Sequence, residues 1–107
     1  MNFITNDPEF AKEAIEVLEN VNDPEIGLNV VDLGLIYNLD IDREEKLIYC
    51  TMTLTTRFCP MSDAITEGVN RALNLKFPHH QIKIQLSFDP PWSAERISEQ
   101  GKAFLNQ

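Results

Sequence analysis

An arrangement of strand, helix and strand in the second half of the sequence limits the possible folds more than any other feature. Apolar and polar residues alternate over residues 46–55 and again over residues 81–88, which is typical of half-buried strands. Between them, apolar side chains recur three and four positions apart from Pro60 to Phe77, and Pro78 ends the predicted helix. A helix that joins two strands of one sheet makes a right-handed crossover, so the sequence predicts a parallel pair here.

The remaining elements complete a small two-layer domain of the α/β (α+β) class. Asp7 and Pro8 begin a predicted helix over residues 8–20, and residues 35–42 alternate as a strand that a charged turn joins to the next strand. Ser93 caps a predicted last helix. The element order α-β-β-α-β-α predicts a small mixed three-stranded sheet with the helices on one face.

The same periodicities predict which residues face the core. In the first strand these residues are Leu35, Tyr37, Leu39 and Ile41. In the last strand they are Ile82, Ile84, Leu86 and Phe88. In the last helix they are Ile97, Gly101, Phe104 and Leu105.

The length and charge of the chain narrow the possible functions. With 107 residues, the chain is expected to form a single domain over residues 1–107, in which residues 1–6 are a flexible tail. The net charge is −8 and there are only nine lysines and arginines, which argues against nucleic acids and anionic membranes as partners. No apolar run is long enough to span a bilayer, and no signal segment stands at the start.

The two cysteines differ in their predicted surroundings. Cys50 lies in the apolar row of a strand and is expected to be a small buried side chain. Cys59 precedes Pro60 and is the predicted N-cap of the central helix, where the helix dipole favours a thiolate. The alternative is that Cys59 fills an apolar gap beside the helix start, and spacing alone does not decide between the two. A disulfide is not expected because the intervening strand carries the chain about 16 Å, and free thiols indicate a reducing cytoplasm.

Residues 21–34 form a long segment with no regular period, interrupted by proline and glycine turn signals. Its apolar residues argue against disorder, so we expect an ordered loop that displays Asp23, Glu25 and Asp32. A loop of this length in a small domain usually has a function. The alternative is that these acidic residues cap short turns, as Asx residues often do.

Four separate motifs combine with these features. They are Asp23-Pro24-Glu25, Val31-Asp32-Leu33-Gly34-Leu35-Ile36-Tyr37, Thr53-Leu54-Thr55-Thr56 with Cys59-Pro60, and Asp89-Pro90-Pro91-Trp92. In this order and spacing the sequence resembles the MIP18 family, also called domain of unknown function 59, over about residues 8–106. That family includes SufT-like bacterial proteins and eukaryotic cytosolic iron–sulfur assembly factors. None of the motifs is specific alone, whereas the combination is.

The resemblance implies an iron–sulfur cluster assembly type of domain and a role in maturing iron–sulfur proteins, without an enzymatic reaction. It implies that Cys59 is the reactive family cysteine, and that the motif residues around it include Asp23, Glu25, Thr55 and Thr56. It also implies iron–sulfur assembly proteins and client apoproteins as partners. The sequence departs from the family pattern at Arg57-Phe58, where relatives often carry small residues, and this departure bears on access to the thiol.

Cluster chemistry limits the mechanism. Protein-bound iron–sulfur clusters normally take four ligands, mostly cysteines, and this chain has two cysteines. A monomer is therefore not expected to hold a stable cluster. Cys59 is a candidate transient ligand for a cluster that a homodimer, a partner protein or small thiols would complete.

The alternative functions use the same residues differently. In a non-catalytic adaptor, the loop around Asp23, the corner at residues 89–92 and the acidic surface recruit assembly proteins, and Cys59 only packs. A thiol enzyme would need a histidine base beside the cysteine, but His79 and His80 are predicted about 25 Å away, past the far end of the helix. RNA binding by a KH-like domain conflicts with the net charge and with the lack of a Gly-X-X-Gly loop.

Overall fold

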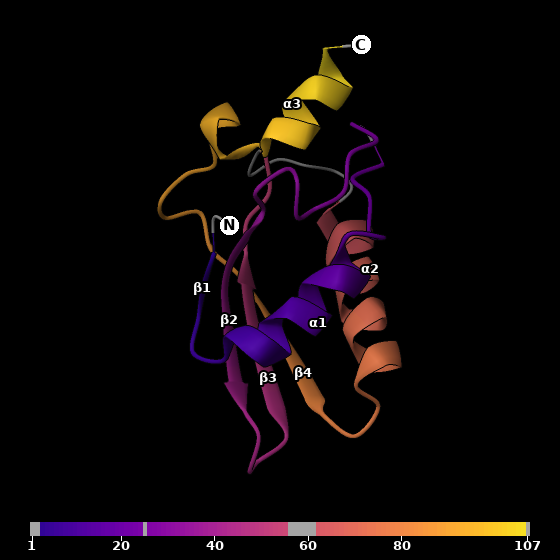
Figure 1. The fold of residues 1–107 in the computed structure, drawn as a ribbon, viewed down its shortest axis with the longest axis vertical. Helices are drawn as coiled ribbons and strands as arrows, with labels where there is room; N and C mark the ends of the chain where they lie inside the picture. Colours follow the sequence, from indigo (N-terminus) through magenta and orange to yellow (C-terminus); the bar gives the residue numbers. More distant parts are fainter. Residues whose placement is uncertain (1–2, 25, 56–61, 107) are drawn as a thin grey trace.

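The computed structural model describes residues 3–24, 26–55 and 62–106. Figure 1 shows a sheet with helices packed on it and a further helix at one end. The elements are β1 (Ile4–Thr5), α1 (Pro8–Leu18), β2 (Ile36–Asp42), β3 (Leu47–Met52), α2 (Ser62–Lys76), β4 (Gln81–Leu86), a short 3₁₀ helix η1 (Ala94–Arg96) and α3 (Glu99–Leu105). The predicted α/β class is confirmed.

Among the described residues the sheet has four strands in the order β1-β2-β3-β4, one more than predicted. β2 and β3 form the expected antiparallel hairpin. β3 and β4 run parallel, as a crossover through α2 requires. The parallel pair inferred from the alternating stretches is therefore confirmed.

The additional strand comes from the segment that was expected to be a tail. Ile4 and Thr5 form β1, which pairs in parallel with β2. Asn6 continues this edge with its side-chain amide, which donates to the carbonyl of Ile41 and accepts from the Ile41 N–H, both at 2.9 Å. The prediction of a tail is thus wrong for residues 4–6, because a two-residue strand is too short to show an alternating pattern.

A bulge in β2 changes which of its residues face the core. Ile36 pairs with Met52 and Asn38 pairs with Thr51, so β2 has one residue more than β3 between these pairs. Ile36 is buried, as are Leu39 and Ile41, whereas Tyr37 is half-buried and lines a hollow together with Asn38 and Thr51. The predicted inward position of Tyr37 is wrong, because simple alternation cannot reveal a bulge.

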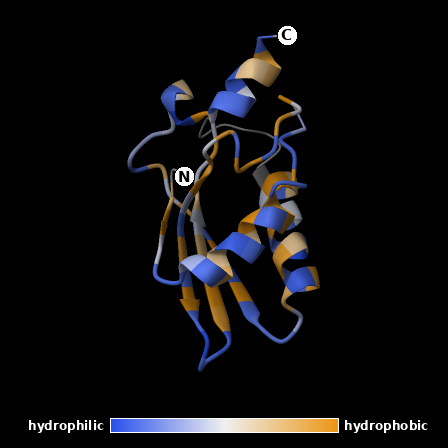
Figure 2. Cartoon of the chain, in the orientation of Figure 1, coloured by the Kyte–Doolittle hydropathy of each residue, from blue (hydrophilic) through white to orange (hydrophobic). Residues whose placement is uncertain are grey.

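α1 and α2 cover one face of the sheet (Figure 1). Figure 2 shows that apolar segments of the strands and of these helices lie toward the space between the two layers. The buried residues of the helices are Ala11, Ala14, Ile15, Leu18, Ile65, Val69 and Leu73, and those of β3 are Ile48, Cys50 and Met52. This core explains why the amphipathic helices and the hairpin form together.

The boundaries of the two core helices agree with the prediction where they are described. Asp7 caps α1, since its carboxylate accepts the Phe10 N–H at 3.3 Å, and Pro8 is the first helical residue. α1 ends at Leu18, two residues before the predicted end. The predicted start of the central helix at Pro60 lies outside the described residues.

The C-terminal part differs most from the prediction. Ser93 precedes η1 without a side-chain capping bond, whereas Ser98 caps α3 by accepting the Gly101 N–H at 2.9 Å. α3 lies beyond the end of the sheet and not on its face (Figure 1). Phe104 and Leu105 are 46% and 42% exposed, so these two residues do not form the predicted inner stripe.

Candidate functional site

Three segments that carry the sequence motifs meet at one end of the sheet, where β2 begins and where β3 and β4 end. They are the loop between α1 and β2, the residues that follow β3, and the corner that follows β4. Hydrogen bonds between these segments hold the end together, and most of them join residues far apart in the sequence. We call this region the motif end.

The first half of the loop is closed by a bridge between Asn22 and Asn29. Inside it, the carboxylate of Asp23 accepts the Ile26 N–H at 3.2 Å, and the Asp23 carbonyl accepts the Gly27 N–H at 2.7 Å. Asp23 is only 2% exposed. Its side chain therefore shapes this turn, as the alternative interpretation of the sequence proposed, and its part in a functional site stays a prediction.

The second half of the loop is a turn that ends at Gly34. Asn29 holds it twice, because its side chain accepts the Asp32 N–H at 2.8 Å and donates to the Asp32 carboxylate at 2.7 Å. Gly34 has a φ of +76°, and a Cβ at this position would lie 2.5 Å from the Arg96 carbonyl oxygen. Only glycine fits this close approach between the loop and η1.

Asp32 connects the loop to the C-terminal segment. The Ser98 hydroxyl donates to the Asp32 carboxylate at 2.8 Å, and the Ser98 N–H donates to the Asp32 carbonyl at the same distance. Because Ser98 is also the cap of α3, the start of this helix depends on Asp32. The structure therefore gives Asp32 a positioning role within the motif end.

The corner after β4 is bound to the same loop. The Trp92 indole N–H donates to the Leu33 carbonyl at 2.7 Å, and the Tyr37 hydroxyl donates to the Pro90 carbonyl at 2.7 Å. Arg96 donates from Nε to the Gly34 carbonyl at 2.8 Å. Its guanidinium carbon lies 4.3 Å from the centre of the Tyr37 ring, which is a cation–π contact.

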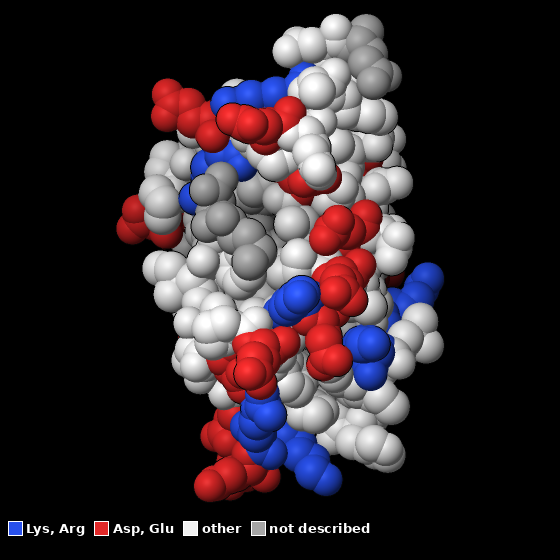
Figure 3. All heavy atoms as spheres, viewed as in Figure 1, with Lys and Arg blue, Asp and Glu red and all other residues white. Residues whose placement is uncertain are grey.

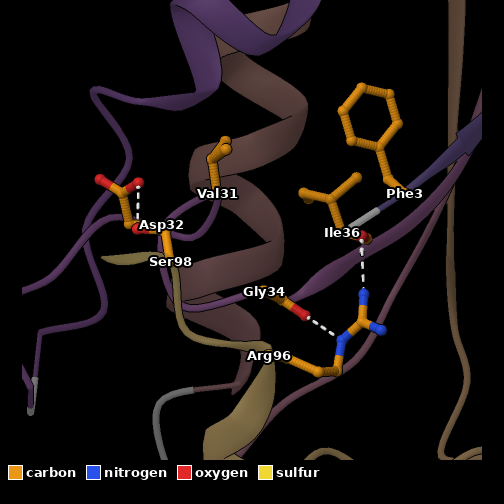
Figure 4. A pocket seen from close by; sticks show the side chains of 7 residues that line it. All are labelled: Phe3, Val31, Asp32, Gly34, Ile36, Arg96 and Ser98. Carbon is orange, nitrogen blue, oxygen red and sulfur yellow. Dashed lines mark hydrogen bonds between the residues drawn. The ribbon is translucent and has the colours of Figure 1, made fainter. Parts of the chain in front are cut away.

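A cavity of about 290 Å³ lies between these segments (Figure 4). Its lining residues are Phe3, Val31, Asp32, Gly34, Ile36, Arg96 and Ser98. The guanidinium of Arg96 and the carboxylate of Asp32 both take part in hydrogen bonds of the surrounding framework. The cavity therefore presents mainly apolar surface, with its charged groups already used for positioning.

The predicted site residues are described only in part. Thr53, fully buried, donates its N–H to the Leu35 carbonyl at 2.8 Å, which joins the segment after β3 to the motif end. Thr55 is half-buried and is the last described residue before the cysteine. Cys59, Thr56 and Glu25 lie outside the described residues, so the predicted grouping of these residues with Asp23 stays a prediction.

The thiol of the other cysteine, Cys50, is not in a reactive position. Cys50 is fully buried, and burial raises the pKa of its thiol to about 12. A thiol of that pKa is protonated and unreactive at neutral pH. The prediction that Cys50 is a small core residue is confirmed.

The two histidines lie near the opposite end of α2 from the motif end. The His80 ring contacts Phe10 and Phe77, with centroid distances of 5.2 and 5.8 Å, so it packs as an aromatic side chain. Within residues 3–24, 26–55 and 62–106, no three His, Cys, Asp or Glu side chains are grouped as metal ligands would be. In that same part of the chain, no helix combines the length and apolarity needed to cross a membrane.

Several residues that build the motif end were not identified from the sequence. Arg96 had no local signal, because the carbonyl of Gly34 that it bonds lies 62 residues away. Tyr37 was identified as a motif residue and as a core-facing residue, but its bond to Pro90, 53 residues away, was not foreseen. Ser98 did have a local signal in the sequence, because a serine followed by Glu99 is a usual helix start. Ser93 was predicted as the cap because its own position after Trp92 matched a hydrophobic staple.

Comparisons with known proteins agree with this architecture. A family model described as iron–sulfur cluster assembly protein matches residues 12–86. Relatives named Fe-S protein maturation auxiliary factor include YitW of Bacillus subtilis, 38% identical over 82% of this chain and 85% of its own, and a Porphyromonas gingivalis protein, 39% identical over 83% and 84%. SufT of Staphylococcus aureus, with the same description, is 35% identical over 79% of this chain and 96% of its own.

Solved structures give the same result. The crystal structure of a domain of unknown function 59 from Bacillus anthracis has a TM-score of 0.86 and 35% identity, covering 92% of this chain and 93% of that one. A Mycobacterium tuberculosis protein described as associated with [Fe-S] complex assembly and repair has a TM-score of 0.53 and 37% identity, covering 92% and 85%.

Proposed function

Because this chain belongs to the iron–sulfur cluster assembly protein family, we propose that it is an auxiliary factor that helps client apoproteins acquire their iron–sulfur clusters. The observation that carries this proposal is the relationship to three proteins named as Fe-S protein maturation auxiliary factors, at 35–39% identity over about four fifths of the chain. The factor acts by binding and transfer in the cytoplasm, without catalysing a reaction of its own.

We assign cluster handling to Cys59. It is one of only two cysteines, and the other, Cys50, is buried and has a pKa raised to about 12. The segment that carries Cys59 follows Thr53 and Thr55, and the Thr53 N–H is bonded to the Leu35 carbonyl of the motif end. Leu35 directly follows the loop that carries Asp23, and on this basis we assign Asp23 to the same site. Glu25, Thr55 and Thr56 complete the proposed set.

In this proposal the cluster is cargo that passes through the protein. One available thiol is too few for a conventional cluster, which takes four ligands. Client apoproteins and assembly proteins supply the remaining ligands during transfer. The chain's own contribution is then a thiol of suitable reactivity and a rigid framework that presents it.

Complementation in cells tests the role of the thiol. Cells that lack the protein receive the wild type, Cys59→Ser or Cys50→Ala, and the activity of an iron–sulfur client enzyme is measured relative to its protein level. We expect Cys59→Ser to leave client activity at the level of the empty vector, while Cys50→Ala, the matched control, supports maturation if it is as abundant as the wild type. Full maturation with Cys59→Ser would refute a thiol role.

Anaerobic reconstitution with iron and sulfide provides a second measurement. We expect the wild type to develop the visible absorbance of a bound cluster in the presence of a small thiol, and Cys59→Ser not to do so. Equal absorbance in both proteins would show that Cys59 is not a ligand. This measurement needs no knowledge of the client.

A non-catalytic adaptor is the second candidate. The observation that favours it is the exposed, acidic surroundings of the corner after β4, where Asp89 and Glu95 are both exposed. Trp92 is half-buried and its indole N–H is bonded to Leu33, so it is not a free anchor for a partner. Partner capture that survives Cys59→Ala but is lost with Asp89→Asn and Glu95→Gln would favour the adaptor. The reverse pattern would favour cluster handling.

A further inference from the structure

The two edges of the sheet are finished differently. At the β1 edge, a short strand and the amide of Asn6 satisfy the backbone of β2, including both groups of Ile41 at 2.9 Å. β4 forms the other edge, and no strand follows it among the described residues. An edge strand of six residues without a proline or a bulge is a ready template for pairing with another strand.

The unpaired backbone groups of β4 can be identified from its register. The Gln81 N–H donates to the Lys46 carbonyl at 2.8 Å and the Ser87 N–H donates to the Met52 carbonyl at 2.9 Å. Because a strand has a two-residue period, the odd-numbered residues direct their backbone groups toward β3. The N–H and C=O groups of the even-numbered residues point away from the sheet, at Ile82, Ile84 and Leu86.

The same three residues form an incompletely covered apolar row. Ile82 and Ile84 are half-buried, and Leu86 is 40% exposed although it lies on the helix-covered side of the strand. Beside them is a hollow of about 250 Å³, whose lining residues are Thr66, Glu67, Asn70, Ile84 and Leu86. A strand added to this edge would gain backbone hydrogen bonds and would cover apolar surface at the same time.

We propose that the added strand is β4 of a second copy of this chain, in antiparallel pairing about a two-fold axis at Ile84. The two four-stranded sheets would then form one continuous eight-stranded sheet. This inference concerns assembly and stands independently of the proposed function.

The residue order of β4 supports this occupant. With the axis at Ile84, Ile82 of one copy lies opposite Leu86 of the other, so apolar residues meet on the helix-covered side. On the other side, Lys83 lies opposite the neutral Gln85, and no like charges face each other. A two-fold axis makes each of these pairs occur twice.

Neighbouring registers are less favourable. An axis at Lys83 would place this lysine directly opposite its own copy, which is destabilising. An axis at Gln85 would leave Ile82 without a partner inside the strand. The Ile84 register therefore pairs most of β4 without opposing charges.

The net charge of −8 allows an experiment to distinguish a second copy of this chain from a basic peptide as the partner of β4. Two copies of an acidic chain repel each other at long range, so added salt should strengthen the association. A basic extended peptide at the same edge would bind more weakly as salt increases. Weaker self-association at higher salt would therefore contradict the proposal.

Substitutions of the exposed residue Gln85 provide a matched pair. Sedimentation velocity of the full chain is measured from micromolar to millimolar concentration. We expect a reversible dimer for the wild type. Gln85→Lys makes both pairs with Lys83 repulsive, whereas Gln85→Glu makes both attractive, so the Gln85→Lys dimer should be weaker than the Gln85→Glu dimer by about an order of magnitude. Net charge alone predicts the opposite order, since Gln85→Lys makes the chain less acidic. Matching thermal unfolding of the two monomers shows that the fold is retained.

Hydrogen exchange locates the interface. As the protein concentration rises, exchange should slow at the amides of Ile82, Ile84 and Leu86, while those of Lys83 and Gln85, already directed toward β3, should change little. A chain that stays monomeric up to millimolar concentration overturns the proposal. So does a dimer in which Gln85→Lys associates more tightly than Gln85→Glu, or in which these three amides remain unprotected.

Discussion

The two ends of the sheet are held together in different ways. At the hairpin end, the turn itself is held locally, since the Asp42 carboxylate accepts the N–H groups of Glu44 and Glu45 at 3.1 and 3.0 Å. Distant residues also contact the hairpin end: the Gln81 N–H donates to the Lys46 carbonyl at 2.8 Å, and Arg43 Nε lies 2.6 Å from the Asp7 carboxylate in an exposed ion pair. Figure 3 shows acidic side chains, interspersed with basic ones, over this end and over α1. The turn of the hairpin is thus formed by bonds between neighbouring residues and by ladder hydrogen bonds of the adjoining strands.

The motif end depends on contacts between distant segments. Tyr37 and Pro90, Leu33 and Trp92, and Asp32 and Ser98 are separated by 53, 59 and 66 residues. Here the backbone is irregular, so hydrogen bonds that a ladder would supply come from individual side chains. We conclude that single substitutions at the motif end should cost much more than substitutions at the hairpin end, and that they should disturb the proposed site.

The largest effect is expected at Gly34. Alanine there would have to tolerate a positive φ and a Cβ 2.5 Å from the Arg96 carbonyl oxygen, and we expect Gly34→Ala to lower the free energy of unfolding by about 3 kcal/mol. Gly27, in the same loop, has a φ of +82° but no atom within 4 Å of a Cβ, so Gly27→Ala should cost about 1 kcal/mol. Urea denaturation measures both. Equal losses would show that the close approach to η1 contributes nothing.

A smaller loss is expected at the cap of α3. Ser98→Ala removes the bonds to the Asp32 carboxylate and to the Gly101 N–H, and should cost about 1–2 kcal/mol. Ser93→Ala is the control, because Ser93 makes no capping bond, and it should change the free energy of unfolding by less than about 0.5 kcal/mol. If the two variants unfold at the same urea concentration, α3 does not depend on Asp32.

Removing one polar atom from the corner should have the next largest effect. Trp92→Phe leaves the carbonyl of the fully buried Leu33 without its indole donor, which should cost about 1 kcal/mol or slightly more. Tyr37→Phe removes an exposed bond to Pro90 and should cost about 0.5 kcal/mol. Thermal and urea unfolding compare the two. A larger loss for Tyr37→Phe would contradict the importance of the Leu33 contact.

The smallest effect is expected at the hairpin end and depends on pH. The hydrogen bond from Arg43 is the main cause that lowers the pKa of Asp7 in the folded chain. A lowered pKa contributes stability above the ordinary carboxyl value of about 3.9, and this contribution disappears as the pH falls through the folded-state pKa. Arg43→Ala should therefore be slightly less stable than the wild type at neutral pH and equal to it in strong acid.

The pKa of Asp7 can be followed directly by NMR titration. It should rise toward its ordinary value in Arg43→Ala and stay unchanged in Lys12→Ala, which removes another exposed cation of the same region. A large loss of stability at neutral pH in Arg43→Ala would break the comparison between the two ends.

The elements that could be predicted from the sequence are those with a repeated pattern. α1, α2, the hairpin and the parallel strand β4 each repeat a period over six or more residues, so that their type and position follow from that period. The predicted inward row of β4 is only partly covered, since Ile82 and Ile84 are half-buried and Leu86 is 40% exposed. β1 has two residues and the β2 bulge involves one extra residue, so neither repeats anything. They were missed for this reason.

The identity of the candidate site residues could be predicted from the sequence, but their positions relative to one another could be predicted only in part. The acidic residues of the loop were identified as either site residues or turn caps, and the structure shows Asp23 and Asp32 bonding within turns and between segments. Asp32 is held by Asn29, three residues away, and by Ser98, 66 residues away, and no pattern in the sequence indicates the second of these pairings. The predicted grouping of site residues around Cys59 remains a prediction.

Local patterns in the sequence are enough to predict the α/β class, the order of the main elements and the burial of Cys50, because periodicity and strand position are local properties of the chain. The meeting of the loop after α1, the end of β3 and the corner after β4 at one end of the sheet is visible only in the three-dimensional fold. The fold also shows that Asn6 closes one sheet edge, whereas no strand of the described residues covers β4. The physical reason is that such hydrogen bonds join groups brought near each other by chain folding, and no residue pattern records which distant partner a side chain will meet.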